Sequence, residues 1–240
     1  MSLLSLVQDS LREIGGFEVP TSVVGNNNET AIRSLALANR SLKETAKRLN
    51  WPGLTVRATL STVASQEEYA LPSDFQSLIN QTIWDDTNNL EVSGPVSASD
   101  WEYLQNSDTA ASTSSISTWF RILRGTSSNN KLMYLFPIPD SVRTLRYEYK
   151  SDALTETSGN VLQGDKYIAD TDVSIVDEDI VALGFKWRFL MSHGLPYVEE
   201  FRDYEVAIET GASAYGAPII DLSARTIRRT TIIVPEGDFG

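Results

Sequence analysis

The chain contains no cysteine and only one histidine, His193. The lack of cysteine excludes disulfide bonds, thiolate metal ligands and a cysteine nucleophile. One histidine is too few for a classical zinc site, which draws on several cysteine and histidine ligands. Ser192 directly precedes His193, and sequence neighbours are poorly placed to act as a nucleophile and its base. We therefore interpret His193 as an imidazole in the last turn of a helix, where the helix dipole favours it.

Long apolar runs are also missing. No segment approaches the roughly 20 apolar residues that span a bilayer, and the N-terminus lacks the basic start and apolar run of a secretory signal. Neither common glycine-rich phosphate-binding pattern, GxxxxGK[ST] or GxGxxG, occurs. We therefore expect a soluble protein made in the cytoplasm, with no membrane contact and no cofactor.

Positive charge is scarce. The chain has 20 lysines and arginines against 32 aspartates and glutamates, which gives a net charge of −12 over 240 residues. A surface of this sign repels the phosphate backbone of nucleic acid and the anionic face of a membrane. It argues against a sequence-reading DNA binder, but it suits a protein past which DNA has to slide. The 41% hydrophobic content predicts a packed globular core.

Apolar residues at helical spacing predict two helices at the start of the chain, over residues 2–14 and from about Glu29 to Asn50. Asn28 is the expected N-cap of the longer helix, because its side chain can accept a hydrogen bond from a free backbone N–H. The expected buried side of that helix consists of Ile32, Leu35, Ala36, Ala38, Leu42, Ala46 and Leu49.

Two further helices are predicted near the end of the chain, from Asp177 to about His193 and from about Tyr197 to Gly216. The turn Gly194–Pro196 is so short that the two helices must run antiparallel. The apolar stripe of the second helix also includes Val198, Ala212 and Tyr215. The residues expected to pack this hairpin together are Ile180, Leu183, Trp187, Leu190, Phe201, Tyr204 and Ile208.

The middle of the chain, residues 54–151, shows short apolar runs separated by turn residues, which predicts a sheet of short strands. Strands at this spacing usually build a sandwich or a barrel. The expected strands are Leu54–Leu60, Glu68–Leu71, Leu78–Trp84, Leu90–Val92, Trp119–Arg124, Lys131–Phe136 and Thr144–Tyr149, with a hairpin over 121–136 and a short helix over 99–106. Trp84, Trp101, Tyr103 and Trp119 are expected in the core of this sheet, and residues 107–118 as a mobile loop.

These elements predict an α+β fold: an antiparallel helix bundle with an inserted β-sandwich or barrel-like domain and an extended C-terminal arm. The expected divisions are the N-terminal helices over 1–53, the inserted β domain over 54–151, a linker with the C-terminal helix hairpin over 152–216, and the arm over 217–240. The linker region, residues 152–175, is polar and has few strong signals.

Acidic residues gather before the C-terminal hairpin, at Asp165, Asp170, Asp172, Asp177, Glu178 and Asp179. Their spacing does not continue the pattern of a calcium-binding loop, so we expect a solvated loop and a helix cap. The doublets Glu67-Glu68 and Asp85-Asp86 do not form a glycosidase pair by themselves, because neighbours in a strand point to opposite faces. A wall-degrading glycosidase using Glu68 remains a remote alternative.

The C-terminal arm carries three arginines, Arg225, Arg228 and Arg229, and no acidic residue between Leu222 and Pro235. Strand-prone apolar residues alternate with them, and an exposed segment of this kind favours strand addition to the sheet of a partner. The expected partner-binding residues, toward a portal or a neighbouring subunit, are Arg225, Ile227, Arg228, Arg229, Ile232, Ile233 and Val234. The alternative is that the arm folds back as an edge strand of its own protein.

Several segments of the chain resemble the head-to-tail adaptor proteins of short-tailed bacteriophages. The run Asp179–Leu190 (DIVALGFKWRFL), the turn Gly194–Tyr197 and the run Glu199–Glu205 are similar to the C-terminal helix hairpin of that family. Trp51-Pro52 after a long helix, the segment Tyr69–Phe75 and the segment Leu135–Pro139 also resemble it, in the same order.

The resemblance implies a structural virion protein without catalysis. It implies a homo-oligomeric ring, a dodecamer, that lies in the neck below the portal protein, connects the capsid to the tail and lines the DNA passage. The bundle would build the ring wall, the arm would reach the portal, and the β insertion would contact a downstream tail, nozzle or fibre protein. Another tail component, such as a fibre-attachment, tube or nozzle protein, is the alternative.

Overall fold

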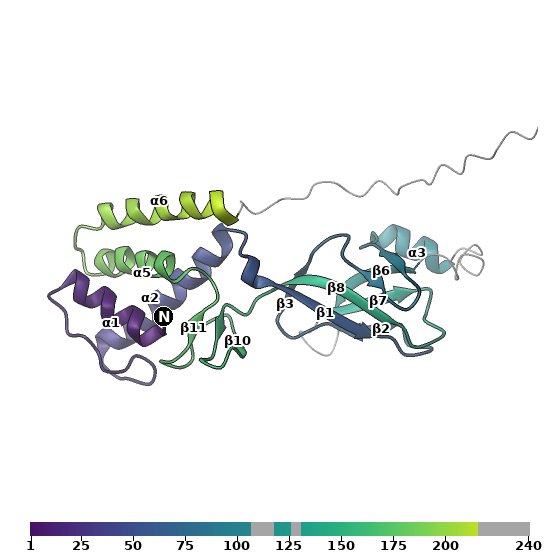
Figure 1. Ribbon diagram of the computed structural model, residues 1–240, viewed down its shortest axis with the longest axis horizontal. Helices are drawn as coiled ribbons and strands as arrows, with labels where there is room; N and C mark the ends of the chain where they lie inside the picture. Colours follow the sequence, from purple (N-terminus) through teal and green to yellow (C-terminus); the bar gives the residue numbers. More distant parts are fainter. Residues whose placement is uncertain (107–117, 126–130, 216–240) are drawn as a thin grey trace, which may run out of the picture.

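The computed structural model describes residues 1–106, 118–125 and 131–215. Figure 1 shows an elongated molecule with a helical lobe at one end and a β lobe at the other. Each lobe has its own cluster of buried apolar side chains. The chain is therefore α+β, with a barrel-like β domain inserted between the helical segments, as the sequence predicts.

The helical lobe contains α1 (Leu3–Ile14), α2 (Glu29–Arg48), α5 (Glu178–Ser192) and α6 (Val198–Tyr215). Side-chain caps set the starts of three of these helices. Ser2 accepts from Ser5 N at α1, Asn28 from Thr30 N at α2, and Asp177 from Asp179 N at α5. The predicted cap at Asn28 is confirmed.

The buried side of α2 differs from the prediction at two positions. Ile32 and Ala36 are exposed, Ile32 by 55%. At about 100° per residue, Ile32 lies about 120° and Ala36 about 160° around the helix from the buried Ala38. The inner side instead uses small hydroxyl residues, which allow the neighbouring helix to approach closely: Ser34, Ser41 and Thr45.

The β lobe is one sheet in the order β1-β8-β4-β5-β6-β7-β2, with β3 also paired to β8. Its longest pairings are β1 with β8 and the predicted β6–β7 hairpin, in which Ile122 lies opposite Met133. Alternating side chains of β8 are buried, as expected for a strand with one face on a core. The strand bounds are β1 (Thr55–Ser61), β2 (Glu68–Ala70), β3 (Phe75–Leu78), β4 (Trp84–Asp85), β5 (Leu90–Ser93), β6 (Thr118–Arg124), β7 (Lys131–Phe136) and β8 (Thr144–Ser151).

The aromatic residues predicted for the core of the sheet divide into two groups. Trp101, on α3 (Ala98–Asn106), is buried, and Trp119 is half-buried. Trp84 and Tyr103 are exposed, so the prediction was wrong for both. Tyr103 is two residues after Trp101 on the same helix and therefore points to another side. The predicted mobile loop falls mostly on residues 107–117, which lie outside the described residues.

The polar segment before α5 forms a small sheet of β9 (Thr155–Glu156), β10 (Leu162–Gly164) and β11 (Val173–Ser174). Asp172 is buried, and its carboxylate accepts from the backbone N–H groups of Ile168 and Ala169 at 2.7 Å. The prediction of a solvated acidic loop was therefore wrong here. Two backbone amides bind Oδ2 of this carboxylate, whereas Oδ1 is buried and has no hydrogen-bond partner among the described residues.

Asp170 also has a structural role. Its carboxylate accepts from Val24 N at 2.8 Å and Val23 N at 3.1 Å, which ties the linker to the loop between α1 and α2. The N-terminus joins the same region, since Leu3 N donates to Asp172 O at 2.8 Å. Segments far apart in the sequence therefore form one lobe.

Candidate assembly interface

The C-terminal hairpin pairs α5 with α6 across a short turn (Figure 1). Gly194 has a φ of 69°, a left-handed conformation that suits glycine, and its N–H donates to Met191 O at 3.1 Å. Figure 1 shows α6 along the outside of the lobe, over α5. One long side of α6 therefore faces away from the other described helices.

The residues predicted to pack the hairpin lie in and around this contact. Ile180, Leu190, Tyr204 and Ile208 are buried, and Leu183 and Trp187 pack against the same core. The Trp187 ring lies edge-on to Phe201, with ring centroids 5.2 Å apart, although Phe201 remains partly exposed. Val198, predicted for the same stripe, is 70% exposed and lies outside the contact.

A close approach between α5 and α2 positions the hairpin on the bundle. Ser41 Oγ donates to Val181 O at 2.8 Å. A Cβ atom placed on Gly184 would lie 2.2 Å from Ser41 Oγ and 3.0 Å from the Tyr204 ring. Only glycine at this position lets α2, α5 and α6 meet so closely.

Arg188 is fully buried between the three helices, which sequence reasoning missed. Its Nη1 donates to Gly184 O at 2.5 Å, and its guanidinium pairs with the Glu44 carboxylate. The guanidinium also lies over the rings of Trp187, at 4.2 Å, and Tyr204, at 5.6 Å. The spacing of Gly184 and Arg188, four residues apart and therefore on one side of the helix, is the signal that could have revealed this cluster.

A second ion pair joins α2 to α6. Arg48 Nη2 donates to Glu205 Oε2 at 2.7 Å, and Arg48 Nη1 donates to Glu205 Oε1. This hydrogen bonding lowers the pKa of Glu205 below its ordinary value and raises the pKa of Arg48. Both charges are therefore held in the folded state, in a fork geometry that fixes the position of α6.

We expect this pair to make the stability of the helical lobe depend on acidic pH. Because the pKa of Glu205 is lower in the folded state, the ionised carboxylate stabilises the fold fully at pH values above its ordinary pKa of 4.5. The contribution is lost as pH falls through the folded-state pKa. Denaturant unfolding across this range should show wild type and Glu205→Gln converging as pH falls. The exposed Glu199→Gln is the control, and a pH-independent gap for Glu205→Gln would contradict the assignment.

His193 was predicted in the last turn of a helix, and it is the C-cap directly after α5, where it has a packing role. Its ring lies 4.8 Å from the Phe17 ring and 4.4 Å from the Phe189 ring, measured between centroids. Its Nε2 lies 3.3 Å from Arg33 Nη1. Ser192 Oγ lies 3.2 Å from His193 Nδ1, but this hydroxyl donates to Phe189 O at 2.8 Å. The arrangement joins α5 to α2 and to the loop after α1.

The carboxylate doublets have structural contacts. Asp85 is buried and accepts from Thr87 N at 2.9 Å and Asn88 Nδ2 at 2.8 Å, while Asp86 pairs with Arg146 at 3.2 Å. Glu68 lies on β2 with its side chain exposed.

In residues 1–106, 118–125 and 131–215, no group of three or more metal-ligating side chains comes together. The same residues contain no helix with the length and hydropathy of a membrane span.

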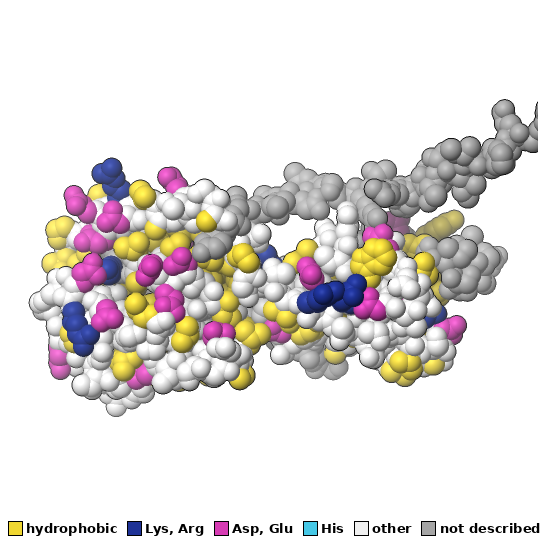
Figure 2. Space-filling view, in the orientation of Figure 1, with side chains coloured by type: hydrophobic (Ala, Val, Ile, Leu, Met, Phe, Trp, Pro, Cys, Tyr) yellow, Lys and Arg dark blue, Asp and Glu magenta, His cyan; other side chains and the backbone are white. Residues whose placement is uncertain are grey.

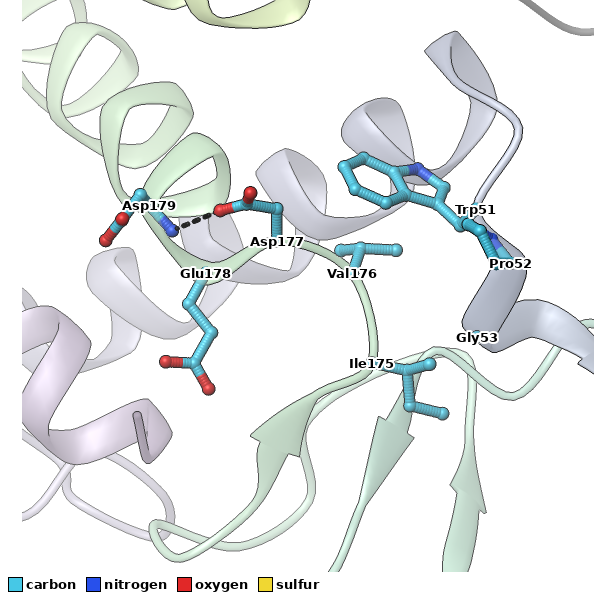
Figure 3. A pocket seen from close by; sticks show the side chains of 8 residues that line it. All are labelled: Trp51, Pro52, Gly53, Ile175, Val176, Asp177, Glu178 and Asp179. Carbon is cyan, nitrogen blue, oxygen red and sulfur yellow. Dashed lines mark hydrogen bonds between the residues drawn. The ribbon is translucent and has the colours of Figure 1, made fainter. Parts of the chain in front are cut away.

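A cavity of about 430 Å³ opens between the turn after α2 and the start of α5 (Figure 3). Two of its three acids are already engaged. Asp177 caps α5, as predicted, and Glu178 pairs with the N-terminal ammonium of Met1. Ile175 lines the cavity next to Gly53, where an added Cβ atom would lie 3.1 Å from Ile175 Cγ2. The cavity therefore lies at the junction between the two lobes. At this junction Trp51 Nε1 donates to Thr45 O at 3.1 Å.

The surface of the helical lobe combines acidic side chains with exposed apolar ones. Figure 2 shows acidic side chains spread over its visible face. Apolar side chains are exposed around the hairpin turn, at Met191, Leu195, Val198 and Phe201. The predicted partner-binding residues of the arm, Arg225 to Val234, lie outside the described residues.

Comparison with known protein families finds a match over almost the whole sequence. A family model described as SU10 adaptor protein matches residues 1–232. The matched range includes both lobes, the hairpin and most of the arm. No curated protein matches the chain. The family match agrees with the resemblance to phage head-to-tail adaptors.

Proposed function

Because the chain belongs to the SU10 adaptor protein family, we propose that it is the head-to-tail adaptor of a virion. It forms a ring below the portal protein, connects the capsid to the tail and surrounds the path of the DNA. The observation that carries this proposal is the adaptor match over residues 1–232, which covers both lobes. The protein acts by holding other proteins in place and catalyses no reaction.

The two lobes have different roles within such a ring. The helices of segments 1–53 and 152–216 build the ring wall. The β domain, residues 54–151, stands away from the helices (Figure 1) and contacts a downstream tail, nozzle or fibre protein. The net charge of −12 keeps DNA from adhering as it passes.

The arm, residues 217–240, reaches the portal or a neighbouring subunit. Its three arginines and its apolar residues make it suitable for adding a strand to the sheet of another protein. The arginines would contact acidic groups of that partner. The apolar residues Ile227, Ile232, Ile233 and Val234 would enter apolar pockets where they face that partner.

Deletion of residues 223–240 should leave the fold intact and abolish docking on the portal. The fold should survive because both apolar cores lie within the described residues before the arm. Circular dichroism and denaturant unfolding check the fold, and co-sedimentation with the cognate portal protein checks docking.

Two arm variants separate charge from strand addition. Replacing Arg225, Arg228 and Arg229 with glutamine should weaken docking and reduce its salt dependence. Replacing Ile227, Ile232 and Ile233 with serine should weaken docking at every salt concentration. Unchanged docking after the full deletion would refute a role for the arm.

A further inference from the structure

The outer side of α6 is acidic and carries exposed apolar residues. Val198 and Val206 are 70% and 53% exposed. Glu199, Asp203 and Glu209 lie on the same side, at about 100° per residue, together with one cation, Arg202. None of these four charged groups makes an ion pair with any described residue. The side therefore keeps a net negative charge and an unpartnered apolar surface.

The outer side of α2 has the opposite charge. Ile32, which is 55% exposed, and Ala36 lie in one stripe with Arg40, Lys43 and Lys47. Lys43 pairs with Asp165, whereas Arg40 and Lys47 make no ion pair within the described part of the chain. Glu29, at the start of the helix, is paired with Arg33. The stripe therefore keeps a net positive charge around exposed apolar residues.

These two helix sides point away from each other. Thr45 and Arg48 of α2 contact Tyr204 and Glu205 of α6. Lys47 is two residues from Thr45, and therefore lies about 160° away from it around the helix. Likewise, Val206 is two residues from Tyr204 and faces away from α2. The acidic and basic sides cannot meet within one chain.

We propose that the outer side of α6 in one copy of this chain packs against the outer side of α2 in the next copy. This inference rests on the proposed ring, for which it names the subunit contact. The two sides have opposite charges and complementary exposed apolar residues. Their helices have similar lengths, 20 residues in α2 and 18 in α6. Two different surfaces on opposite sides of a subunit form a head-to-tail contact, which closes into a ring when the rotation permits.

Charge reversal tests this contact. One variant carries Arg40→Glu and Lys47→Glu, and the other carries Glu199→Lys and Asp203→Lys. Each variant alone brings like charges together at every contact, which should weaken each contact by about tenfold or more and prevent ring assembly. An equimolar mixture should assemble again, because contacts in an alternating ring are either native or doubly reversed. The mass of each sample, with and without the cognate portal protein, is measured by light scattering.

Matched controls place charge reversals on the β lobe, at the exposed Arg57→Glu and Glu102→Lys, where assembly should be unchanged. If wild type assembles and both α2 and α6 variants also assemble, the proposed contact is refuted while the ring remains. The contact is equally refuted if neither the mixture nor a chain with all four reversals regains assembly. If wild type never assembles, the ring fails and the contact fails with it.

Discussion

Tyr204→Ala is expected to destabilise the helical lobe by about 3–5 kcal/mol, because it leaves a large cavity in a packed core. The Tyr204 ring is fully buried between three helices. It lies 5.6 Å from the guanidinium carbons of both Arg48 and Arg188, and its centroid lies 6.4 Å from that of Trp187. Its loss would remove the common contact of these groups. Denaturant unfolding followed by circular dichroism measures the change in the free energy of unfolding.

Tyr204→Phe is the matched control, since it removes only the hydroxyl. That hydroxyl lies 3.3 Å from Thr45 Oγ1, so the expected loss is about 1 kcal/mol. Equal losses for the two substitutions would mean that the ring contributes little. That result would contradict a bundle held together at this residue.

Gly184→Ala should cost about 2–3 kcal/mol, because overpacking forces neighbouring side chains and backbone apart. The added methyl group would lie 2.2 Å from Ser41 Oγ and 3.1 Å from Arg188 Nη1. In an exposed helix the same substitution would stabilise, so the sign of the effect is diagnostic. The free energy of unfolding again provides the measurement.

Two further variants test the cause of this loss. Gly164→Ala places a methyl group where no heavy atom lies within 4 Å, and it should be nearly neutral. Adding Ser41→Ala to Gly184→Ala removes the nearest clashing atom and should recover part of the lost stability. If the double variant loses the sum of the two single losses, the clash is not the cause.

Local sequence signals were sufficient to predict the main elements. The caps at Asn28 and Asp177, the β6–β7 hairpin and the antiparallel pair α5–α6 are local features, set by side-chain capping, alternation and a short turn. The predicted insertion of a barrel-like sheet between helices also follows from the change of apolar period along the chain. These predictions needed no knowledge of distant contacts.

The features that sequence reasoning missed depend on contacts between distant segments. Asp172 is buried because backbone amides of its own loop bind it, and that loop in turn pairs with the N-terminus. Ile32 is exposed because the inner side of α2 uses serine and threonine. Arg188 is buried because Glu44 and two aromatic rings surround it. A hydropathy pattern assigns each of these residues to the opposite environment.

The same contacts connect the fold to the proposed ring. The half-buried ion pair between Arg48 and Glu205 holds α6 on the bundle, so that its outer side has a fixed orientation. A fixed orientation lowers the entropic cost of assembly, because less of the surface has to be ordered when the subunits meet. Stability of the helical lobe and formation of the ring should therefore change together in variants of the hairpin.

The assembly proposed for this chain is a ring on a portal protein. Its most direct test is the mass of the complex formed when the purified chain is mixed with its cognate portal protein, measured by light scattering after size-exclusion chromatography. We expect a single complex whose mass exceeds that of the portal by a full ring of 26.6 kDa chains. A portal that elutes at its own mass, with the chain separate at micromolar concentrations, would contradict it.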